Sequence, residues 1–262
     1  MQAAFPMKDQ ASARPLFAGL PCLHGIAEAG LNGMGHVWTD SPTRPRAAVM
    51  TVGDFILCGG EAGLSATRML RTALQSDKRG WLVYAPGAWM DALRKIAPCH
   101  LLERRAFDPL VQPEDGHLRE ILAKAPPDVA IQPLEGEWIS WCRGQEWSED
   151  FVSQFTDEAF AAQGLGVLLM MDGEPISGAS SYVRYPGGIE IQVTTREDCD
   201  GHGYATLASA ALILRAHERG LAATWDSANP VSEHIALKLG YHAAEYYVVA
   251  APHMEAERTE TY

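Results

Sequence analysis

The chain has 262 residues, which is enough for one large domain or two smaller ones. Hydrophobic residues make up 47% of it and charged residues 21%, proportions that are typical of a globular protein and exclude a largely disordered one. A formal net charge of -12 at pH 7 argues against nucleic acid or an anionic membrane as a partner and favours a cationic substrate such as an amine.

The spacing of cysteines and histidines excludes further classes of protein. The five cysteines are scattered without a C-x-x-C pair, which is typical of a reducing cytosol and argues against a disulfide framework. The nine histidines form no H-x-x-x-H or H-E-x-x-H spacing, so we expect no metal site. No apolar run approaches the roughly 18 residues that a membrane span needs. We therefore expect a cytoplasmic protein.

The N-terminal part of the chain predicts a mixture of strands and helices. Residues 16–31 can hold a short helix that Gly33 and Gly35 end. Apolar or β-branched runs bounded by glycine and proline predict strands, and apolar residues four apart predict helices. The predicted strands are residues 36–39, 47–52, 55–58, 81–84 and 103–108, and the predicted helices are residues 65–74 and 88–96.

A proline-rich stretch follows the last of these strands. Pro109, Pro113, Pro126 and Pro127 mark the expected domain boundary, with a helix predicted between them at residues 116–124. We expect an N-terminal α/β region at residues 1–125 and a second domain at residues 126–262.

The second half alternates between strands and helices. A strand is predicted at residues 129–132, followed by helices at 137–142 and 148–160, the latter with Ser148 as its N-cap. Asp172-Gly173 between apolar runs predicts a hairpin. The predicted later strands are residues 166–171, 176–183, 190–195 and 221–225, then a hairpin-like pair at 241–250, with a helix at 229–239 that Gly240 ends.

The stretch from Glu190 to Ala211 carries the strongest chemical signal. A β-branched strand runs into a short polar turn containing Gly201 and Gly203, and then into an alanine- and leucine-rich helix. The free N–H groups of a first helical turn and the helix dipole favour an anion, and glycine lets the anion approach the backbone. The turn therefore predicts a phosphate-binding loop, with an ordinary β–α connection as the alternative.

Two motifs make this half of the chain resemble the GNAT (GCN5-related N-acetyltransferase) superfamily. D-G-H-G-Y-A at residues 200–205 fills the frame of that family's acetyl-CoA motif, R/Q-x-x-G-x-G/A. W-D-S-A-N-P-V-S-E-H-I-A-L-K-L-G-Y at residues 225–241 is similar to its second signature. The resemblance is greatest to a bacterial subgroup with an N-terminal α/β region, and it covers nearly the whole chain.

The resemblance implies the fold class and the cofactor. The fold would be α/β (α+β), with a C-terminal GNAT domain of mixed, splayed sheet and flanking helices. The N-terminal region would be a degenerate copy of that fold or a wall of the acceptor pocket. Acetyl-CoA would be the cofactor, with coenzyme A as the product.

The resemblance also implies which residues bind acetyl-CoA. Strand backbone groups would hold the pantetheine arm, loop amides would hold the pyrophosphate, and the next helix would reach the pantetheine side. These positions are, in turn, Val193, Thr194 and Thr195, then Asp200, Gly201, His202, Gly203, Tyr204, Ala205 and Thr206, then Asn229 and Ser232. A helix N-cap is the alternative role of Asn229, since asparagine does this well before a proline.

Two positions depart from the family pattern. Asp200 stands where the family has Arg or Gln, beside a diphosphate of like charge. Ala236 stands where many members have the tyrosine that protonates the leaving thiolate. The general acid would then be Ser232, Tyr241, Tyr246 or solvent.

Transfer to an amine also needs a base, because only the neutral amine is a nucleophile. Glu190 is the first candidate, with a solvated or salt-bridged strand residue as the alternative. Asp226 is the second candidate, with a structural role as the alternative. Cys199 could form an acyl-cysteine, although the family usually transfers directly. The tryptophans at 138, 141 and 147 are expected in a core rather than in an acceptor pocket.

The function that follows is transfer of an acetyl group from acetyl-CoA to a primary amine of a small molecule. The alternatives are a non-catalytic acyl-CoA-binding or regulatory protein of GNAT fold, favoured by Asp200 and Ala236, and a glycine-turn α/β protein unrelated to CoA. We expect no nucleic-acid or membrane partner, and a homodimer is allowed.

Overall fold

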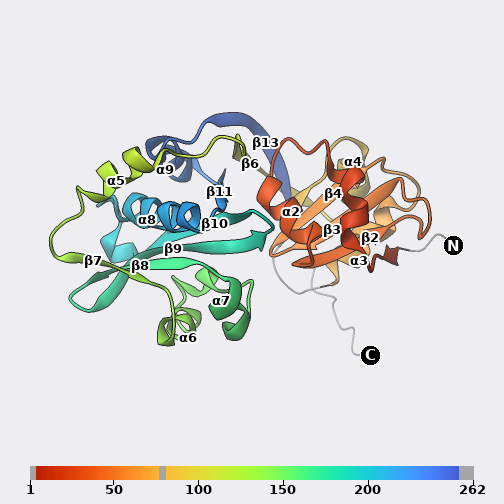
Figure 1. Ribbon diagram of the computed structural model, residues 1–262. Coiled ribbons are helices and arrows are strands. Elements are labelled where there is room, and N and C mark those ends of the chain that lie inside the picture. Colours follow the sequence, from red (N-terminus) through yellow and green to blue (C-terminus); the bar gives the residue numbers. More distant parts are fainter. Residues whose placement is uncertain (1–3, 77–80, 254–262) are drawn as a thin grey trace, which may run out of the picture. The chain divides into compact units, whose positions relative to one another are not determined.

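The computed structural model describes residues 4–76 and 81–253 (Figure 1). The chain forms two compact units. The first contains the residues up to Pro21, Ile26–Arg104 and the residues from Tyr246 onward, and the second contains Cys22–Gly25 and Arg105–Glu245. Residues 105–125, expected in the N-terminal region, therefore lie in the second unit, and residues from 246 onward lie in the first.

The first unit is built on an antiparallel meander followed by a β–α–β connection. Strands β1 (Phe5–Pro6), β2 (Gly35–Thr39), β3 (Ala47–Val52) and β4 (Phe55–Gly60) pair antiparallel in chain order. After helix α3 (Ala66–Leu74), strand β5 (Leu82–Tyr84) pairs parallel to β4. The unit also contains η1 (Gln10–Ala13), α1 (Arg14–Phe17), most of α2 (His24–Leu31), α4 (Ala88–Arg94) and parts of β6 (Cys99–Phe107) and β13 (Ala243–Pro252).

The core of the first unit follows from the spacing of apolar residues. Helix α3 buries Ala66, Met69, Leu70 and Ala73, which lie three or four apart and so share one helix face. They pack in one cluster with Ile56 and Trp89, among other buried residues. The strands predicted at 36–39, 47–52 and 55–58 and the helix predicted at 65–74 are confirmed within one or two residues.

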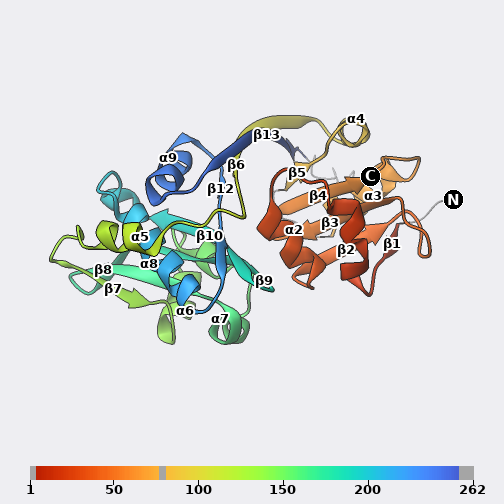
Figure 2. The ribbon, with the colours of Figure 1, turned by 45° about the horizontal axis from the view of Figure 1, so that its top comes forward.

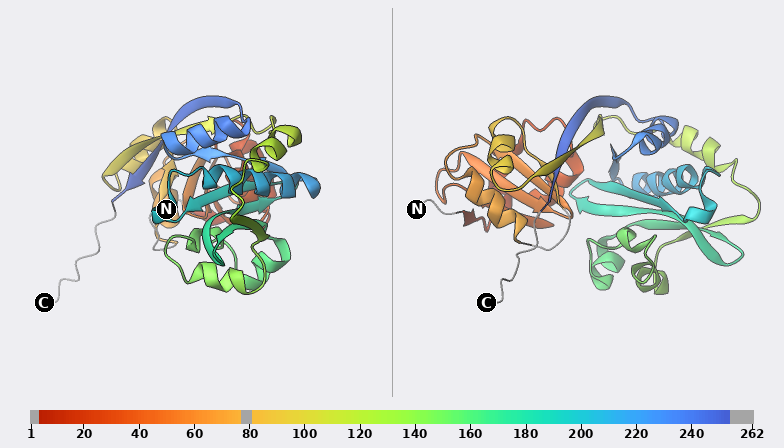
Figure 3. Two further views of the ribbon diagram at one scale, coloured as in Figure 1. Left: turned by 90° about the vertical axis from the view of Figure 1, so that its left-hand side faces the viewer. Right: turned by 180° about the vertical axis from the view of Figure 1, so that it is seen from behind.

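The second unit contains a five-stranded sheet covered by helices on both faces (Figures 1 and 3). Helix α8 (Tyr204–Glu218) covers one face, and α6 (Glu137–Arg143) and α7 (Asp157–Gln163) lie on the other. The sheet order is β11 (Ala222–Thr224), β10 (Gly188–Thr195), β9 (Glu174–Tyr185), β8 (Gly166–Met171) and β7 (Val129–Pro133). Only β11 is parallel to its neighbour. The α/β class is confirmed.

The smaller elements of the second unit complete it around this sheet. They are α5 (Asp115–Leu122), the 3-10 turns η2 (Glu149–Phe151) and η3 (Glu197–Cys199), the short strand β12 (Asp226–Ser227) and α9 (Pro230–Leu239) (Figure 2). The predicted hairpin turn is confirmed, with Asp172 and Gly173 at φ of 51° and 85°. Positive φ at both turn residues matches the twist of the flanking strands.

The two units share one order of elements. Each runs through a strand, short helices, three antiparallel strands, a helix, a strand parallel to the last one, and another helix. In the first unit these are β1, the helices to α2, β2–β4, α3, β5 and α4, and in the second they are β7, α6 to α7, β8–β10, α8, β11 and α9. The N-terminal region therefore has the topology of a second copy, although no internal repeat is evident in the sequence.

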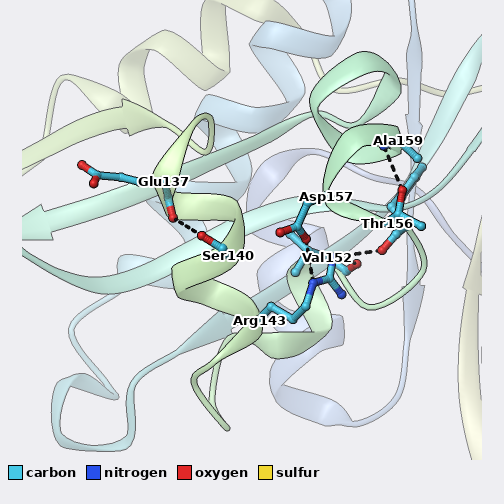
Figure 4. Close-up of polar contacts among 8 residues, drawn as sticks. Glu137, Ser140, Arg143, Val152, Thr156, Asp157 and Ala159 are labelled. Carbon is cyan, nitrogen blue, oxygen red and sulfur yellow. Dashed lines mark hydrogen bonds and ion pairs between the residues drawn. The ribbon is translucent and has the colours of Figure 1, made fainter.

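The helix predicted at 148–160 is wrong in its middle. Residues 149–151 form η2, and α7 begins at Asp157 with the Thr156 Oγ1 accepting the Ala159 N–H at 3.2 Å (Figure 4). Arg143 donates to the carbonyls of Val152 and Phe155 and pairs with Asp157, so it uses carbonyls that a continuous helix would need. Ser148 stands at the predicted N-cap position, now of η2, but its side chain makes no capping hydrogen bond, because its Oγ donates to the Cys142 carbonyl.

The hairpin predicted at 241–250 is also wrong. Tyr241 is buried in the core, and residues from Ala243 form the single strand β13. The sequence from 242 to 250 contains no Gly, Asn, Asp or Pro that would favour a turn. The helix predicted at 16–31 is divided into α1 and α2, with Pro21 between them.

Candidate functional site

Strands β10 and β11 separate at the β11 edge of the second unit's sheet. Their parallel pairing ends at Glu190 and Thr224, whereas β10 remains paired with β9 as far as Thr195. The register of β9 and β10 shifts between Glu190 and Ile191, and such a bulge bends a strand. Val193, Thr194 and Thr195 therefore lie on a stretch of β10 that has no strand partner on its β11 side among the described residues.

The predicted loop lies between the end of this stretch and helix α8. Gly201 and Gly203 have φ of 81° and 82°, a backbone conformation that favours glycine. A Cβ added at either residue would meet no heavy atom within 4 Å, so the loop is open on that side. Gly203 is the N-cap of α8 without a side-chain cap, and Tyr204, Ala205 and Thr206 form the first helical turn. Amide groups here suit an oxygen-rich anion.

Charges around the loop are mixed. Arg196 is paired with Asp198, its Nε donating to Oδ1 at 2.6 Å, and it also donates to the Pro175 carbonyl. Asp200 is exposed. His202 Nδ1 lies 2.9 Å from the Asp200 carbonyl, so Nδ1 carries the hydrogen, and its ring stacks on Tyr204. The Arg196 guanidinium is thus already paired with the Asp198 carboxylate.

The start of helix α9 carries the other cofactor candidates. Asn229 caps the helix, its Oδ1 accepting the Ser232 N–H at 2.9 Å. The side-chain amide of Asn229 is exposed and keeps its donors for a ligand. Ser232 Oγ accepts from Trp225 Nε1 at 3.1 Å and lies 3.3 Å from Ser227 Oγ. Both roles weighed for Asn229 are compatible with this arrangement.

The base candidate Glu190 lies at the point where the strands separate. Its side chain is buried, with 5% of the residue exposed. The Thr224 hydroxyl donates to Glu190 Oε2 at 2.5 Å. A carboxylate kept from bulk water suits a proton acceptor better than a solvated surface acid does. Asp226, in β12, is partly exposed and paired through its backbone with Ala106.

The acid candidates have different surroundings. Tyr241 is buried, and its hydroxyl donates to the Ala223 carbonyl at 2.6 Å. Burial, then the charge of Glu190 and the nearby Tyr185, raises the pKa of Tyr241 well above its ordinary value. Tyr246 is 52% exposed and belongs to the first unit. Ser232 is partly buried at the start of α9.

Two residues limit the chemistry. Ala236 is fully buried in the second unit's core, so no side chain replaces the family tyrosine at that position. Burial, and then the hydrogen bond and charge of Asp198, raise the pKa of the Cys199 thiol, which disfavours the thiolate that an acyl-cysteine route would need. Direct transfer is the route that these surroundings favour.

Three neighbours of Glu190 were not found by sequence reasoning. They are Thr224, Tyr185 and Gly25, each remote from Glu190 in the chain or on another strand. Gly25 is packed so closely that an added Cβ would overlap Glu190 Oε2 and lie 2.5 Å from Thr224 Oγ1. Only the register of β11 against β10 places Thr224 beside Glu190, and the sequence alone carries no signal for the other two.

The expected packing of the tryptophans is confirmed. Trp138, Trp141 and Trp147 are partly buried against the core of α6, η2 and α7 and contact one another edge to face. Within residues 4–76 and 81–253, no group of three or more His, Cys, Asp or Glu is arranged to hold a metal ion. No helix in the same residues is long and apolar enough to cross a bilayer.

This splayed sheet with a glycine loop at the start of a helix is the architecture of GNAT acetyltransferases. A family model described as GNAT acetyltransferase matches residues 15–250. The chain belongs to the GNAT acetyltransferase family. Among curated proteins, none matches the sequence.

Solved structures give the same result. A GCN5-related N-acetyltransferase-like protein from Streptococcus suis 89/1591 is 30% identical, with a TM-score of 0.83 over 94% of this chain and 100% of that chain. A GCN5-related N-acetyltransferase from Kribbella flavida is 19% identical, with a TM-score of 0.52 over 80% of this chain and 88% of that one. A tandem GNAT protein from the clavulanic acid biosynthesis pathway is 13% identical, with a TM-score of 0.53 over 97% and 99%. The last two show likeness of fold alone.

Proposed function

We propose that the protein transfers an acetyl group from acetyl-CoA directly to a primary amine of a small molecule. The observation that carries the proposal is the continuity of two features. The stretch of β10 without a partner on its β11 side leads directly into the Gly201–Gly203 loop at the start of α8. An extended pantetheine arm followed by a diphosphate needs such a strand edge followed by such amides.

The residues near the point where β10 and β11 separate can each be given a role in the transfer. Acetyl-CoA would supply the acetyl group as a thioester, and a β10 N–H near Val193 would polarise its carbonyl. Glu190 would take a proton from the acceptor ammonium, and the neutral nitrogen would then attack the carbonyl carbon. As the C–S bond breaks, the nitrogen would release its second proton to water, which leaves a neutral amide. Ser232 or water would return a proton to the thiolate, since Ala236 offers none.

A small amine suits the charge of the protein. The net charge of -12 attracts cations over a distance of about one Debye length. A buried carboxylate at Glu190 favours an acceptor that arrives as an ammonium. Ala236 and Asp200 favour the alternative, an acyl-CoA-binding or regulatory protein that does not turn over.

Calorimetry and a thiol-release assay distinguish these functions. Isothermal titration with acetyl-CoA measures binding, and free thiol released in the presence of a panel of small primary amines measures transfer. We expect micromolar binding and release with at least one amine. Binding without release on any amine would support the regulatory protein, and absence of binding would contradict both.

A substitution in the loop tests the placement of the diphosphate. Gly203→Glu puts a Cβ and a negative charge where the phosphates would lie, so we expect acetyl-CoA binding to be lost while the protein stays folded. Gly220→Glu is the matched control. Gly220 also has positive φ, 67°, and open space around it, but it follows the far end of α8. The Gly220→Glu variant should therefore bind acetyl-CoA like the wild type. Unchanged affinity of Gly203→Glu would mean that the loop does not hold the cofactor.

A further inference from the structure

The hydroxyl of Thr224 has two acceptors for its single hydrogen. Thr224 Oγ1 lies 2.5 Å from Glu190 Oε2 and 3.0 Å from the backbone carbonyl of Ile189, in donor geometry to each. A threonine hydroxyl carries one donor and two lone pairs, so the two hydrogen bonds cannot be donated at the same time. The arrangement therefore has two states that differ in the direction of one O–H bond.

Each state fits one charge state of Glu190. When the carboxyl is ionised, the Thr224 hydroxyl donates to Oε2 and stabilises the charge. When the carboxyl is protonated, its O–H donates to Thr224 Oγ1, and the threonine hydrogen turns to the Ile189 carbonyl. Glu190 Oε2 and the Thr224 hydroxyl keep a hydrogen-bond partner in both states, which matters because a buried, unsatisfied polar group is costly.

We propose that Thr224 is a positioning residue that reverses its hydrogen bond when Glu190 gains a proton from the acceptor amine. The inference rests on the proposed function, in which Glu190 is the proton acceptor. The proton leaves the ammonium nitrogen, resides on the Glu190 carboxyl during attack and passes to water afterwards. Thr224 gains and loses no proton, so only the orientation of its O–H bond changes.

Other residues pack closely around the Glu190–Thr224 pair. Gly25 packs over the hydrogen bond so closely that a methyl group there would overlap the carboxylate. The titratable groups near the pair include Tyr185 from β9, whose hydroxyl lies 3.4 Å from Thr224 Oγ1, and Tyr241 from the turn after α9. They also include His24, whose ring contacts Tyr185 edge to face. The Tyr185 hydroxyl lies within hydrogen-bond distance of Thr224 Oγ1 and can donate to it in both states.

The proposal is tested by titrating Glu190 directly. Glutamate labelled with ¹³C at the carboxyl is followed by infrared difference spectroscopy or NMR across pH, and the Glu190 signal is assigned by its absence in Glu190→Gln. Thr224→Val removes the hydroxyl at nearly constant shape. A hydrogen bond to a charged group is stronger than one to a neutral group. We therefore expect the titration midpoint of Glu190 to move up by about one pH unit in Thr224→Val.

Three further variants make the result specific. In Thr224→Ser, which keeps the hydroxyl, the titration midpoint of Glu190 should equal that of the wild type. In Thr224→Ala the midpoint should move up as in Thr224→Val, and this variant is used instead if Thr224→Val does not fold. Tyr185→Phe leaves the donor in place and should titrate like the wild type. An unshifted midpoint in both Thr224→Val and Thr224→Ala would overturn the proposal, and so would an equal shift in Thr224→Ser.

A parallel measurement separates this inference from the proposed function. All variants should bind acetyl-CoA with wild-type affinity in calorimetry, because Thr224 lies at the end of the paired region rather than at the loop. In the amine assay, the rising limb of the pH profile of thiol release should move with the titration midpoint. If the wild type does not bind acetyl-CoA, the proposed function is wrong. The titration of Glu190 would still show whether its midpoint depends on the Thr224 hydroxyl.

Discussion

Asp200 is the residue of the glycine loop whose charge opposes its proposed ligand. It is exposed, and the nearby Arg196 is held by Asp198. Like charges several ångströms apart at a surface cost about 1 kcal/mol, and salt reduces that cost. The loop would therefore bind the diphosphate through amides against an unfavourable side chain.

We predict that Asp200→Arg tightens acetyl-CoA binding about tenfold at low salt, because it replaces a repulsive charge by an attractive one. Calorimetry at low and high ionic strength measures this, and the gain should shrink as salt rises. The control is Asp128→Arg, which makes the same charge change in an exposed loop before β7, at the opposite edge of the sheet from β11. An equal gain in both variants would indicate a general charge effect.

Tyr241 and Tyr246 form a matched pair of acid candidates. We predict that Tyr241→Phe lowers the free energy of unfolding by about 1–2 kcal/mol, because the buried Ala223 carbonyl loses its donor. Tyr246→Phe, at an exposed site, should change it by less than about 0.5 kcal/mol. Urea unfolding measures both. We expect thiol release to be unchanged in Tyr241→Phe, and a drop of tenfold or more would make Tyr241 the acid after all.

At the scale of single residues, the sequence predicted what depends on local conformation. The glycine loop and the Asn229 cap need only their immediate neighbours, and the structure has both turns as expected. The partners of Glu190 could not be predicted. Thr224 and Gly25 reach it through strand register and chain packing, and neither leaves a local pattern in the sequence.

At the scale of elements, helices α5 and α8 are joined by one side-chain pair. His217 Nδ1 of α8 lies 2.7 Å from Asp115 Oδ1 of α5. The hydrogen bond from His217 lowers the pKa of the Asp115 carboxyl; burial opposes it, and the charge of His217 and then Arg119 add to the lowering. A lowered pKa means that the pair stabilises the fold above the unfolded-state pKa of aspartate, about 3.9, and that this is lost as pH falls through the lower folded value.

We predict that Asp115→Asn flattens the acid side of the stability profile. Between pH 5 and pH 2 the melting temperature of the wild type should fall further than that of the variant, because only the wild type loses the ionised pair. Calorimetry across that range measures the difference. Asp128→Asn removes an exposed carboxylate that forms no ion pair within the described residues, and its profile should follow the wild type.

The two elements that sequence patterns missed have different causes. In residues 148–160 helical spacing is present, but Arg143 takes the carbonyls of Val152 and Phe155 and the chain turns instead. In residues 241–250 the expected hairpin required a turn that no residue there favours. In the first case a contact from elsewhere decided the outcome over local propensity, and in the second the local sequence itself favours one continuous strand.

At the scale of the whole molecule, the two units share one order of elements and differ in the residues of the loop that precedes the central helix. Both have a strand, a loop and a helix in equivalent places, but only the loop of the second unit contains a G-x-G turn immediately before its helix. The first unit has Gly63-Leu64-Ser65 before α3. Acetyl-CoA should therefore bind to the second unit alone.

We predict that hydrogen exchange with acetyl-CoA shows protection at residues 191–206 and near Asn229, and none in β2, β3 or β4. A ligand stabilises the segments that it contacts or orders, by about 2.7 kcal/mol at a hundredfold excess over Kd when opening exposes the site. The melting temperature should rise with ligand concentration. Equal protection in the first unit would mean that it also binds the cofactor.

The division of the chain between the units has a consequence for synthesis. The first unit begins with the earliest residues, yet its strand β5 pairs with β13, Val83 opposite Ala250. A ribosome releases the N-terminus first, so everything in the second unit has emerged before that pairing becomes available. Until then β5 presents an open edge to any neighbouring strand, a state that favours misassembly. Strand β13, most of which is synthesised after the whole second unit, therefore completes the first unit.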